Sequence, residues 1–180
     1  TAGAKFNASI NGLNTAFSTT TDVLGVVLTG VFWDGGGDGT SWHDAANWNE
    51  DTLPANGNNV LIDVNATPTV LLSIGNVSLQ KLYSNETLTI DGTGVSLTLA
   101  DNSLIDTDFT VRNGATLTAA GVNGHIEAIR SVTLSASNVI ASGGGQVVLN
   151  ALAYHGGAQA TTLRATGTGS RVNLSSINNV

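Results

Sequence analysis

The sequence predicts an all-β fold, a right-handed parallel β-solenoid, with a β-sandwich or jelly roll as the alternative. Three observations support it: very short apolar segments alternate with Thr, Ser and Asn, glycine-rich turns separate them, and the phrase at positions 141–149 recurs at positions 165–174. Charged residues form only 11% of the 180 residues and methionine is absent, whereas ordinary soluble domains carry about 25% charged residues. Thr, Ser, Asn and Gly favour strands and tight turns over helices.

Residues 1–30 form an N-terminal extension whose structure the sequence leaves open. Four apolar residues fit helical spacing, i, i+4, i+7 and i+11: Phe6, Ile10, Leu13 and Phe17. The Thr and Asn content favours extended backbone instead. We therefore expect either a short helix or an extended strand, which could be exchanged with a neighbouring copy, followed by a strand over residues 23–28.

Residues 31–59 form a compact motif rich in Trp, Gly and Asp. This segment holds all three tryptophans of the chain, Trp33, Trp42 and Trp48. Its Gly-Gly-Gly and Asp-Gly steps favour turns with positive φ. We expect a loop-rich cap, anchored by the indoles, at the start of the repeats.

Residues 60–180 carry the repeated pattern. The short apolar segments lie at residues 60–62, 70–72, 77–79, 88–90, 95–99, 109–111, 116–118, 132–134, 147–149 and 172–174. Sandwich strands usually have about 5–6 residues, whereas a solenoid has several very short strands in each coil of roughly 20–25 residues. In such a coil the apolar residue points inward and its polar neighbour faces water. The short segments therefore favour the solenoid.

Two phrases recur within this region. Residues 141–149 resemble residues 165–174, and residues 87–92 resemble residues 116–121. The strand pattern of residues 171–177 reaches the last residues of the sequence, so we expect the repeats to continue beyond Val180.

The motif of the cap is similar to a segment known from other proteins. Residues 33–42 read W-D-G-G-G-D-G-T-S-W, residues 44–48 D-A-A-N-W and residues 58–62 N-N-V-L-I. Together they resemble the segment that opens β-helical repeat regions of large bacterial surface and secreted proteins, of the filamentous-haemagglutinin and autotransporter adhesin type. The resemblance covers about residues 31–180 and implies surface display, adhesion or scaffolding, with no catalytic residue.

From this resemblance we expect an extracellular, non-catalytic structural or adhesive module of a bacterial surface protein. Two alternatives stay open: a self-assembling filament or surface-layer subunit, and a glycan-binding or glycan-cleaving β-helix domain. The net charge of −7, from 6 basic and 13 acidic residues, disfavours nucleic acid and anionic membranes as partners. The expected partners are other copies, other surface-protein domains or glycans, and no membrane insertion is expected because the sequence lacks a run of about 20 apolar residues.

The three tryptophans have two interpretations. Trp33, Trp42 and Trp48 could stack on the C–H faces of sugars, because aromatic rings bind apolar surfaces of pyranoses. Alternatively they plug the open end of the solenoid and are buried there. We favour the plug.

Acidic residues near glycines suggest a calcium site. Asp34, Asp38 and Asp44 could supply carboxylate ligands, and glycine turns expose the backbone carbonyls that Ca²⁺ also uses. Their spacing matches neither an EF-hand loop nor the calcium-binding nonapeptide repeat, so the alternative is that they stabilise turns. A second acidic group consists of Asp101, Asp106 and Asp108.

Enzyme chemistry finds little support in the residues. A β-solenoid polysaccharide lyase pairs acidic calcium ligands with a basic residue, roles that Asp106, Asp108, Arg112 and Arg130 could take. Nothing in their spacing supports this assignment. The chain has no nucleophile elbow and no phosphate loop, so we expect no enzyme.

Overall fold

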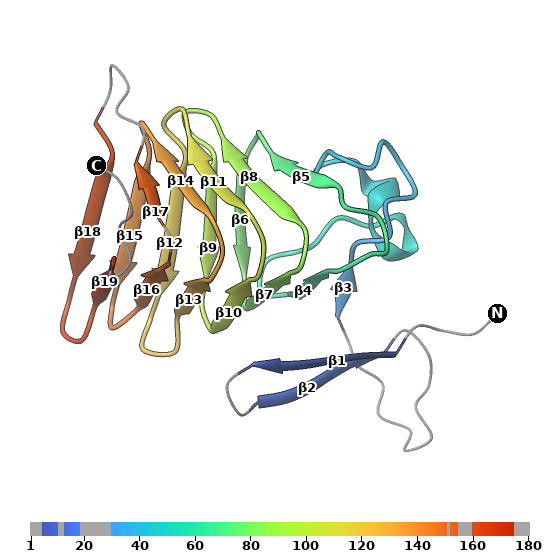
Figure 1. Ribbon diagram of the computed structural model, residues 1–180, viewed down its shortest axis with the longest axis horizontal. Coiled ribbons are helices and arrows are strands. Elements are labelled where there is room, and N and C mark those ends of the chain that lie inside the picture. The colour runs from blue at the N-terminus through green and yellow to red at the C-terminus, as the bar shows by residue number, and fades with distance from the viewer. Residues whose placement is uncertain (1–4, 11–12, 19–29, 151, 155–159, 175–180) are drawn as a thin grey trace. The chain divides into compact units, whose positions relative to one another are not determined.

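The computed structural model is nearly all-β and forms a parallel β-solenoid of about five turns, which confirms the predicted fold (Figure 1). It describes residues 5–10, 13–18, 30–150, 152–154 and 160–174. The chain divides into two compact units, Thr1–Gly30 and Val31–Val180. In the described ranges, no helix has the length and apolar character needed to cross a bilayer.

The first unit contains an antiparallel pair of strands, β1 (Lys5–Ile10) and β2 (Leu13–Ser18). The described residues of the extension, 5–10 and 13–18, are therefore strands, as in the extended alternative, and not a helix. Phe6 pairs with Phe17 and Ile10 pairs with Leu13, so the spacing that fits a helix also places these residues opposite one another across two strands. The strand expected over residues 23–28 lies outside the described residues.

The second unit is built from three parallel sheets. The first sheet contains β3 (Val31–Phe32), β4 (Asn59–Ile62), β7 (Lys81–Ser84), β10 (Asn102–Ile105), β13 (His125–Ala128), β16 (Gln146–Leu149) and β19 (Arg171–Asn173). The second sheet contains β5 (Thr69–Leu72), β8 (Thr87–Asp91), β11 (Phe109–Arg112), β14 (Val132–Ser135) and β17 (Leu152–Tyr154). The third sheet contains β6 (Asn76–Leu79), β9 (Ser96–Leu99), β12 (Thr116–Ala120), β15 (Asn138–Ser142) and β18 (Thr162–Thr166).

Each coil visits the three sheets in the same order, and its strands pair with those of the next coil. The coils differ in length. Thr69 and its partner Thr87 in the next coil are separated by fewer residues along the chain than Gln146 and its partner Arg171. The recurrence of residues 141–149 at 165–174 reflects this stacking, because Ala141 is the partner of Ala165. All named strands of this unit pair in parallel, unlike the antiparallel strands of a sandwich.

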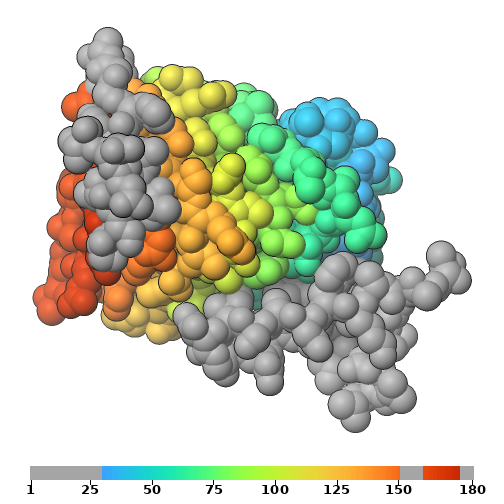
Figure 2. Space-filling model, in the orientation of Figure 1, coloured from blue at the N-terminus to red at the C-terminus, as the bar shows by residue number. Residues whose placement is uncertain are grey.

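The core lies inside the coils. In β9, Leu97 and Leu99 are fully buried and Thr98 between them is partly exposed, which is the alternation expected of a strand with one face inside. Buried positions stack from coil to coil, as in one column of the third sheet: Val77, Leu97, Leu117 and Val139. Burying each such side chain contributes about 1.5–3 kcal/mol. Figure 2 shows the coils packed as successive bands of colour.

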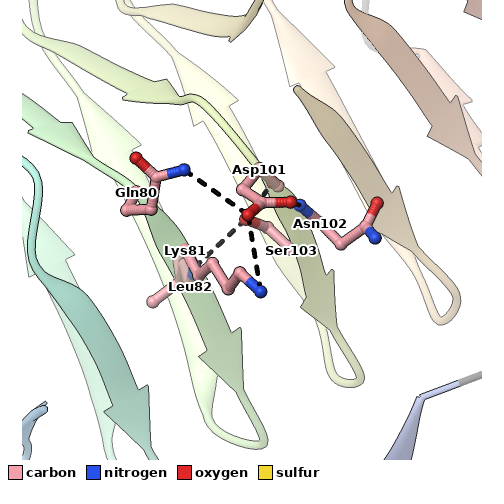
Figure 3. A network of polar contacts seen from close by, with 6 residues as sticks. All are labelled: Gln80, Lys81, Leu82, Asp101, Asn102 and Ser103. Atoms are coloured by element: carbon pink, nitrogen blue, oxygen red, sulfur yellow. Dashed lines mark hydrogen bonds and ion pairs between the residues drawn. The ribbon is translucent and has the colours of Figure 1, made fainter. Parts of the chain in front are cut away.

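A polar network joins neighbouring coils at the start of β7 and β10 (Figure 3). The Asp101 carboxylate accepts a hydrogen bond from Gln80 Nε2 at 3.4 Å and forms an ion pair with Lys81 Nζ at 3.4 Å. Ser103 Oγ accepts a hydrogen bond from Leu82 N at 3.1 Å and donates to Asp101 O at 3.0 Å. The serine hydroxyl therefore takes the place of a backbone carbonyl in the ladder.

A second buried serine leads to a testable prediction. Ser137 is 1% exposed, and its hydroxyl has no hydrogen-bond partner among the described residues. A buried polar group without a partner costs about 1–3 kcal/mol. We therefore expect Ser137→Ala to raise the free energy of unfolding by about 1 kcal/mol in urea denaturation. Ala115, which occupies the same position one coil earlier, is fully buried and shows that alanine fits in this column.

Ser84 supplies the matched control for this substitution. It is also fully buried, but its hydroxyl donates to Glu86 O at 2.8 Å. Ser84→Ala removes a satisfied hydrogen bond and is expected to lower the free energy of unfolding by about 1 kcal/mol. Equal losses in both variants would show that the Ser137 hydroxyl does stabilise the fold.

Candidate functional site

The strongest candidate site is the loop between β3 and β4, residues 33–58, which we call the cap loop. Because of this loop, Val31 and its partner Val60 are separated by a longer stretch of chain than the partners in any other described coil. Its backbone makes hydrogen bonds to the first strand that follows it in every sheet: Trp33 N to Leu61 O, Leu71 N to Thr40 O, Trp42 N to Leu71 O, Gly57 N to Ser78 O and Gln80 N to Asn58 O, at 2.8–3.0 Å. Since unpaired edge strands can pair with other chains, the cap loop protects the N-terminal end of the solenoid.

The three tryptophans form the centre of the cap loop. Trp33, Trp42 and Trp48 are 2%, 1% and 0% exposed and belong to the same core as the coils. Trp48 packs edge-on against both others, with ring centroids 5.0 Å from Trp33 and 4.8 Å from Trp42. Trp48 Nε1 also donates to Trp42 O at 2.7 Å. Stacking on a sugar requires an exposed ring face, and these rings instead pack as a plug.

Asn47 is the hydrogen-bonding centre of the cap loop. Its side chain is fully buried. Asn47 Oδ1 accepts from Gly37 N at 3.0 Å and Gly39 N at 2.8 Å, while Nδ2 donates to Asp38 Oδ1 at 2.8 Å and Ser41 O at 2.9 Å. All four hydrogen-bonding positions of the amide are therefore used. Sequence reasoning missed this residue, since nothing in one sequence distinguishes it from the other asparagines.

The three predicted calcium ligands are used within the loop. Each carboxylate accepts a hydrogen bond from the backbone N–H two residues ahead, as in an Asx turn: Asp34 from Gly36 at 3.0 Å, Asp38 from Thr40 at 2.8 Å and Asp44 from Ala46 at 3.1 Å. No group of three His, Cys, Asp or Glu side chains is arranged to hold a metal ion in the part of the chain that the structure describes. The carboxylates thus act as structural acceptors here.

Two glycines of the motif are required by close contacts. A Cβ atom on Gly37 would overlap the Asp44 carboxylate, and one on Gly36 would lie 2.8 Å from Ala46 O. Both distances are too short for a non-bonded carbon and oxygen. Gly36 and Gly37 therefore lack side chains because the 44–46 turn packs directly on their backbone.

Asp38 has the most perturbed acidity of the loop. Backbone hydrogen bonds from Ser41 and Thr40, and then the Asn47 amide, lower its pKa to about 2 from 3.8. Hydrogen bonds to the charged form favour ionisation. Because the folded pKa lies below the unfolded pKa, the ionised carboxylate stabilises the fold above about pH 4, and this contribution is lost between about pH 4 and pH 2.

Asp38→Asn tests this contribution. The amide oxygen keeps an acceptor for Thr40 and Ser41 but carries no charge. We expect a lower thermal midpoint than wild type at neutral pH, with the difference shrinking as the pH falls from about 4 to about 2. Comparing the two proteins at each pH cancels the other titrating groups. A difference that stays constant over this range would contradict the assignment.

Of the residues considered for a lyase, Asp106, Asp108 and Arg130 lie at the corner between the first and second sheets, whereas Arg112 lies at the corner between the second and third sheets. Arg112 binds Asp91 at 2.8 Å, and Arg130 binds Asp106 at 2.9 Å. Among the described residues, neither arginine makes an ion pair with Asp108, and Asp101 pairs with Lys81. Each of these ion pairs joins neighbouring coils, which is a structural arrangement.

Comparison with known protein families, curated proteins and solved structures finds no match for this chain.

Proposed function

We propose that the chain is a non-catalytic structural or adhesive module, displayed outside the cell by a bacterial surface protein. The observation that carries this proposal is the solenoid itself: a continuous core of stacked side chains, sealed at its N-terminal end by the cap loop. Such a fold offers outer faces for contact with other molecules. Its interior is filled by the stacked Val, Leu, Ile and Phe side chains.

The outer face of the third sheet suits a contact surface. Over β6, β9, β12 and β15 its outward side chains are uncharged: Asn76, Ser78, Ser96, Thr98, Thr116, Thr118, Ala120, Asn138, Ile140 and Ser142. Hydroxyls and amides can both donate and accept hydrogen bonds. A repeated and uncharged face of this kind supports a role in adhesion or scaffolding.

The position of the tryptophan motif also supports the proposal. The similar segment in adhesin-type surface proteins opens their β-helical repeats. Here the segment covers the free edges of the first coil, which is the task that the start of any such repeat region requires. Surface display and adhesion are therefore the functions that this combination favours.

Two measurements test the proposal. Antibodies against the chain should label intact producing bacteria, and external protease should remove the label without lysing the cells. Beads coated with the folded chain should bind host or neighbouring bacterial cells better than beads coated with the heat-unfolded chain. Label found only after lysis would contradict surface display, and equal binding by both kinds of bead would contradict an adhesive role.

A further inference from the structure

The corner between the first and second sheets is enlarged in one coil. Residues 63–68 join β4 to β5, whereas residues 85–86, 106–108 and 129–131 make the same connection in the next three coils. Loops that extend from a regular scaffold are where function is usually added, and in repeat proteins such insertions lie on the faces between repeats. The 63–68 loop is therefore a candidate site separate from the cap loop.

This loop carries the acceptor pattern of N-linked glycosylation, Asn-x-Thr, as Asn65, Ala66 and Thr67. All three residues are exposed, and none of them makes one of the hydrogen bonds found among the described residues. The loop is held at its start, because Val64 N donates to Glu86 Oε1 at 3.2 Å. The acceptor segment is therefore accessible while the coils stay folded.

The Asn-x-Ser/Thr pattern occurs elsewhere in the chain, starting at residues 7, 76, 85 and 173. The patterns at 7 and 173 include residues whose side chains lie outside the described part of the structure. The pattern at 76–78 lies within β6, where Val77 is buried, Asn76 Oδ1 accepts from Ser96 Oγ at 2.7 Å and Ser78 O accepts from Gly57 N at 2.9 Å. An enzyme could reach this asparagine only after β6 left the third sheet.

The pattern at 85–87 lies in the short connection between β7 and β8. Asn85 N donates to Ile62 O at 2.8 Å, and Asn85 Nδ2 donates to Asp63 Oδ1 at 3.2 Å. Glu86, the middle residue, is 3% exposed. The amide that would take up a sugar is thus engaged within the corner, in contrast to that of Asn65.

We propose that Asn65 is an acceptor for N-linked glycosylation, with an oligosaccharide carried on a polyprenyl diphosphate as the sugar donor. Asn65 Nδ2 forms a bond to C1 of the first sugar while the bond between C1 and the diphosphate oxygen breaks. The amide nitrogen gives one proton to a base of the transferase, polyprenyl diphosphate leaves, and no atom is oxidised or reduced. The inference rests on the export assumed in the proposed function, because the sugar is transferred outside the cytoplasm.

Asp63 gives the transferase a means of selecting this segment. It lies two residues before Asn65, where the patterns at 76–78 and 85–87 have Ile74 and Tyr83. A basic group beside the acceptor site of the transferase would attract the segment with the carboxylate and leave the two neutral ones. Exposure and charge therefore both favour Asn65.

Expression of the whole chain, behind an export signal, in a bacterium with an N-glycosylation pathway is the first test. Mass spectrometry of proteolytic peptides should show that the peptide with Asn65 gains the mass of the oligosaccharide, while those with Asn76 and Asn85 keep their sequence masses. An unmodified Asn65 in cells that glycosylate a reference acceptor protein would overturn the proposal. Because the added signal supplies export, this result does not depend on surface display, which the antibody labelling tests separately.

Variants of the loop are the second test, and circular dichroism checks that each keeps its fold. Thr67→Ala should abolish the mass gain, whereas Thr67→Ser, which keeps the hydroxyl of the pattern, should retain it. Asp63→Asn should reduce the modification, although its amide oxygen still accepts from Asn85 Nδ2. A mass gain that survives Thr67→Ala would overturn the assignment of the pattern, and full modification of Asp63→Asn would exclude selection by charge.

Discussion

Trp48→Ala is expected to lower the free energy of unfolding by about 3–5 kcal/mol, the range found for large aromatic residues removed from a core. Trp48 has no exposed surface and touches both other indoles. Its loss opens a cavity between Trp33 and Trp42 and removes the hydrogen bond from Nε1 to Trp42 O. Urea denaturation followed by far-UV circular dichroism measures the change.

Trp48→Phe separates the two contributions. Phenylalanine keeps an edge-on aromatic contact but cannot donate to Trp42 O. We expect it to lose roughly half as much stability as alanine does. A Trp48→Ala variant with wild-type stability would show that the indole plug does not hold the cap loop on the coils.

Asn47→Asp is expected to lower the free energy of unfolding by about 3 kcal/mol at neutral pH, although the side chains have the same shape. The carboxylate can still accept from Gly37 N and Gly39 N. It cannot donate to Asp38 Oδ1 or Ser41 O, and it places a buried negative charge beside the Asp38 carboxylate. Both effects oppose the native loop. The loss should diminish at low pH, where protonation restores one donor.

Asn58→Asp is the matched control for this substitution. Asn58 Oδ1 accepts one hydrogen bond from Ala55 N at 2.7 Å in an exposed turn, and aspartate preserves that acceptor. We expect a change within about 0.5 kcal/mol, as for most surface substitutions. A similar loss in both variants would mean that added negative charge, and not the broken network around Asn47, is responsible.

Because of where the tryptophans lie, fluorescence can follow the unfolding of the cap loop separately from that of the strands. All three tryptophans lie in the cap loop, so selectively excited tryptophan fluorescence reports this loop alone, while far-UV circular dichroism reports the strands. In Trp48→Phe and Asn47→Asp, fluorescence should change at lower urea concentration than circular dichroism. Solenoid units depend mainly on their neighbours, which allows the first unit of the stack to open before the rest.

The sequence predicted the solenoid and those of its strands whose segments alternate apolar and polar residues. Besides β3, β15, β17 and β18, it missed β7, β10 and β13 of the first sheet. Ser84 and Ser103 occupy buried positions there, and Lys81 and Glu127 occupy outward ones. Ser103 can be buried because its hydroxyl receives a hydrogen bond from the backbone of the preceding coil, a compensation that only three-dimensional contacts reveal.

Of the two pairs of similar segments in the sequence, one pair predicts correctly which strands stack on each other and the other pair does not. Residues 141–149 and 165–174 stack directly, but residues 87–92 and 116–121 belong to β8 and β12, which lie in different sheets. All three sheets bury alternate residues against one core, so they select similar sequences. Similarity between segments therefore identifies strands more reliably than it identifies partners.

In the cap loop, the sequence identified the tryptophans and aspartates but not how they are used. Trp residues amid glycines fit either an exposed platform or a plug, and only burial distinguishes the two. Asp34, Asp38 and Asp44 could bind a cation or terminate turns, and the observed acceptor contacts are those of turns. Gly37 is explained by the Asp44 side chain, which approaches it only in the folded loop.

The one-to-one stacking of coils also determines how the molecule yields to force. Tension that pulls on the chain at the last coil breaks that coil's hydrogen bonds to its neighbour one after another, while each deeper layer shares the same force over all three sheets at once. Coils then peel away in succession, and each releases roughly 20–25 residues, or about 70–90 Å of extended chain. In the proposed adhesive role, a module of this kind would lengthen in short steps under load, each step absorbing part of the force, before the attachment broke.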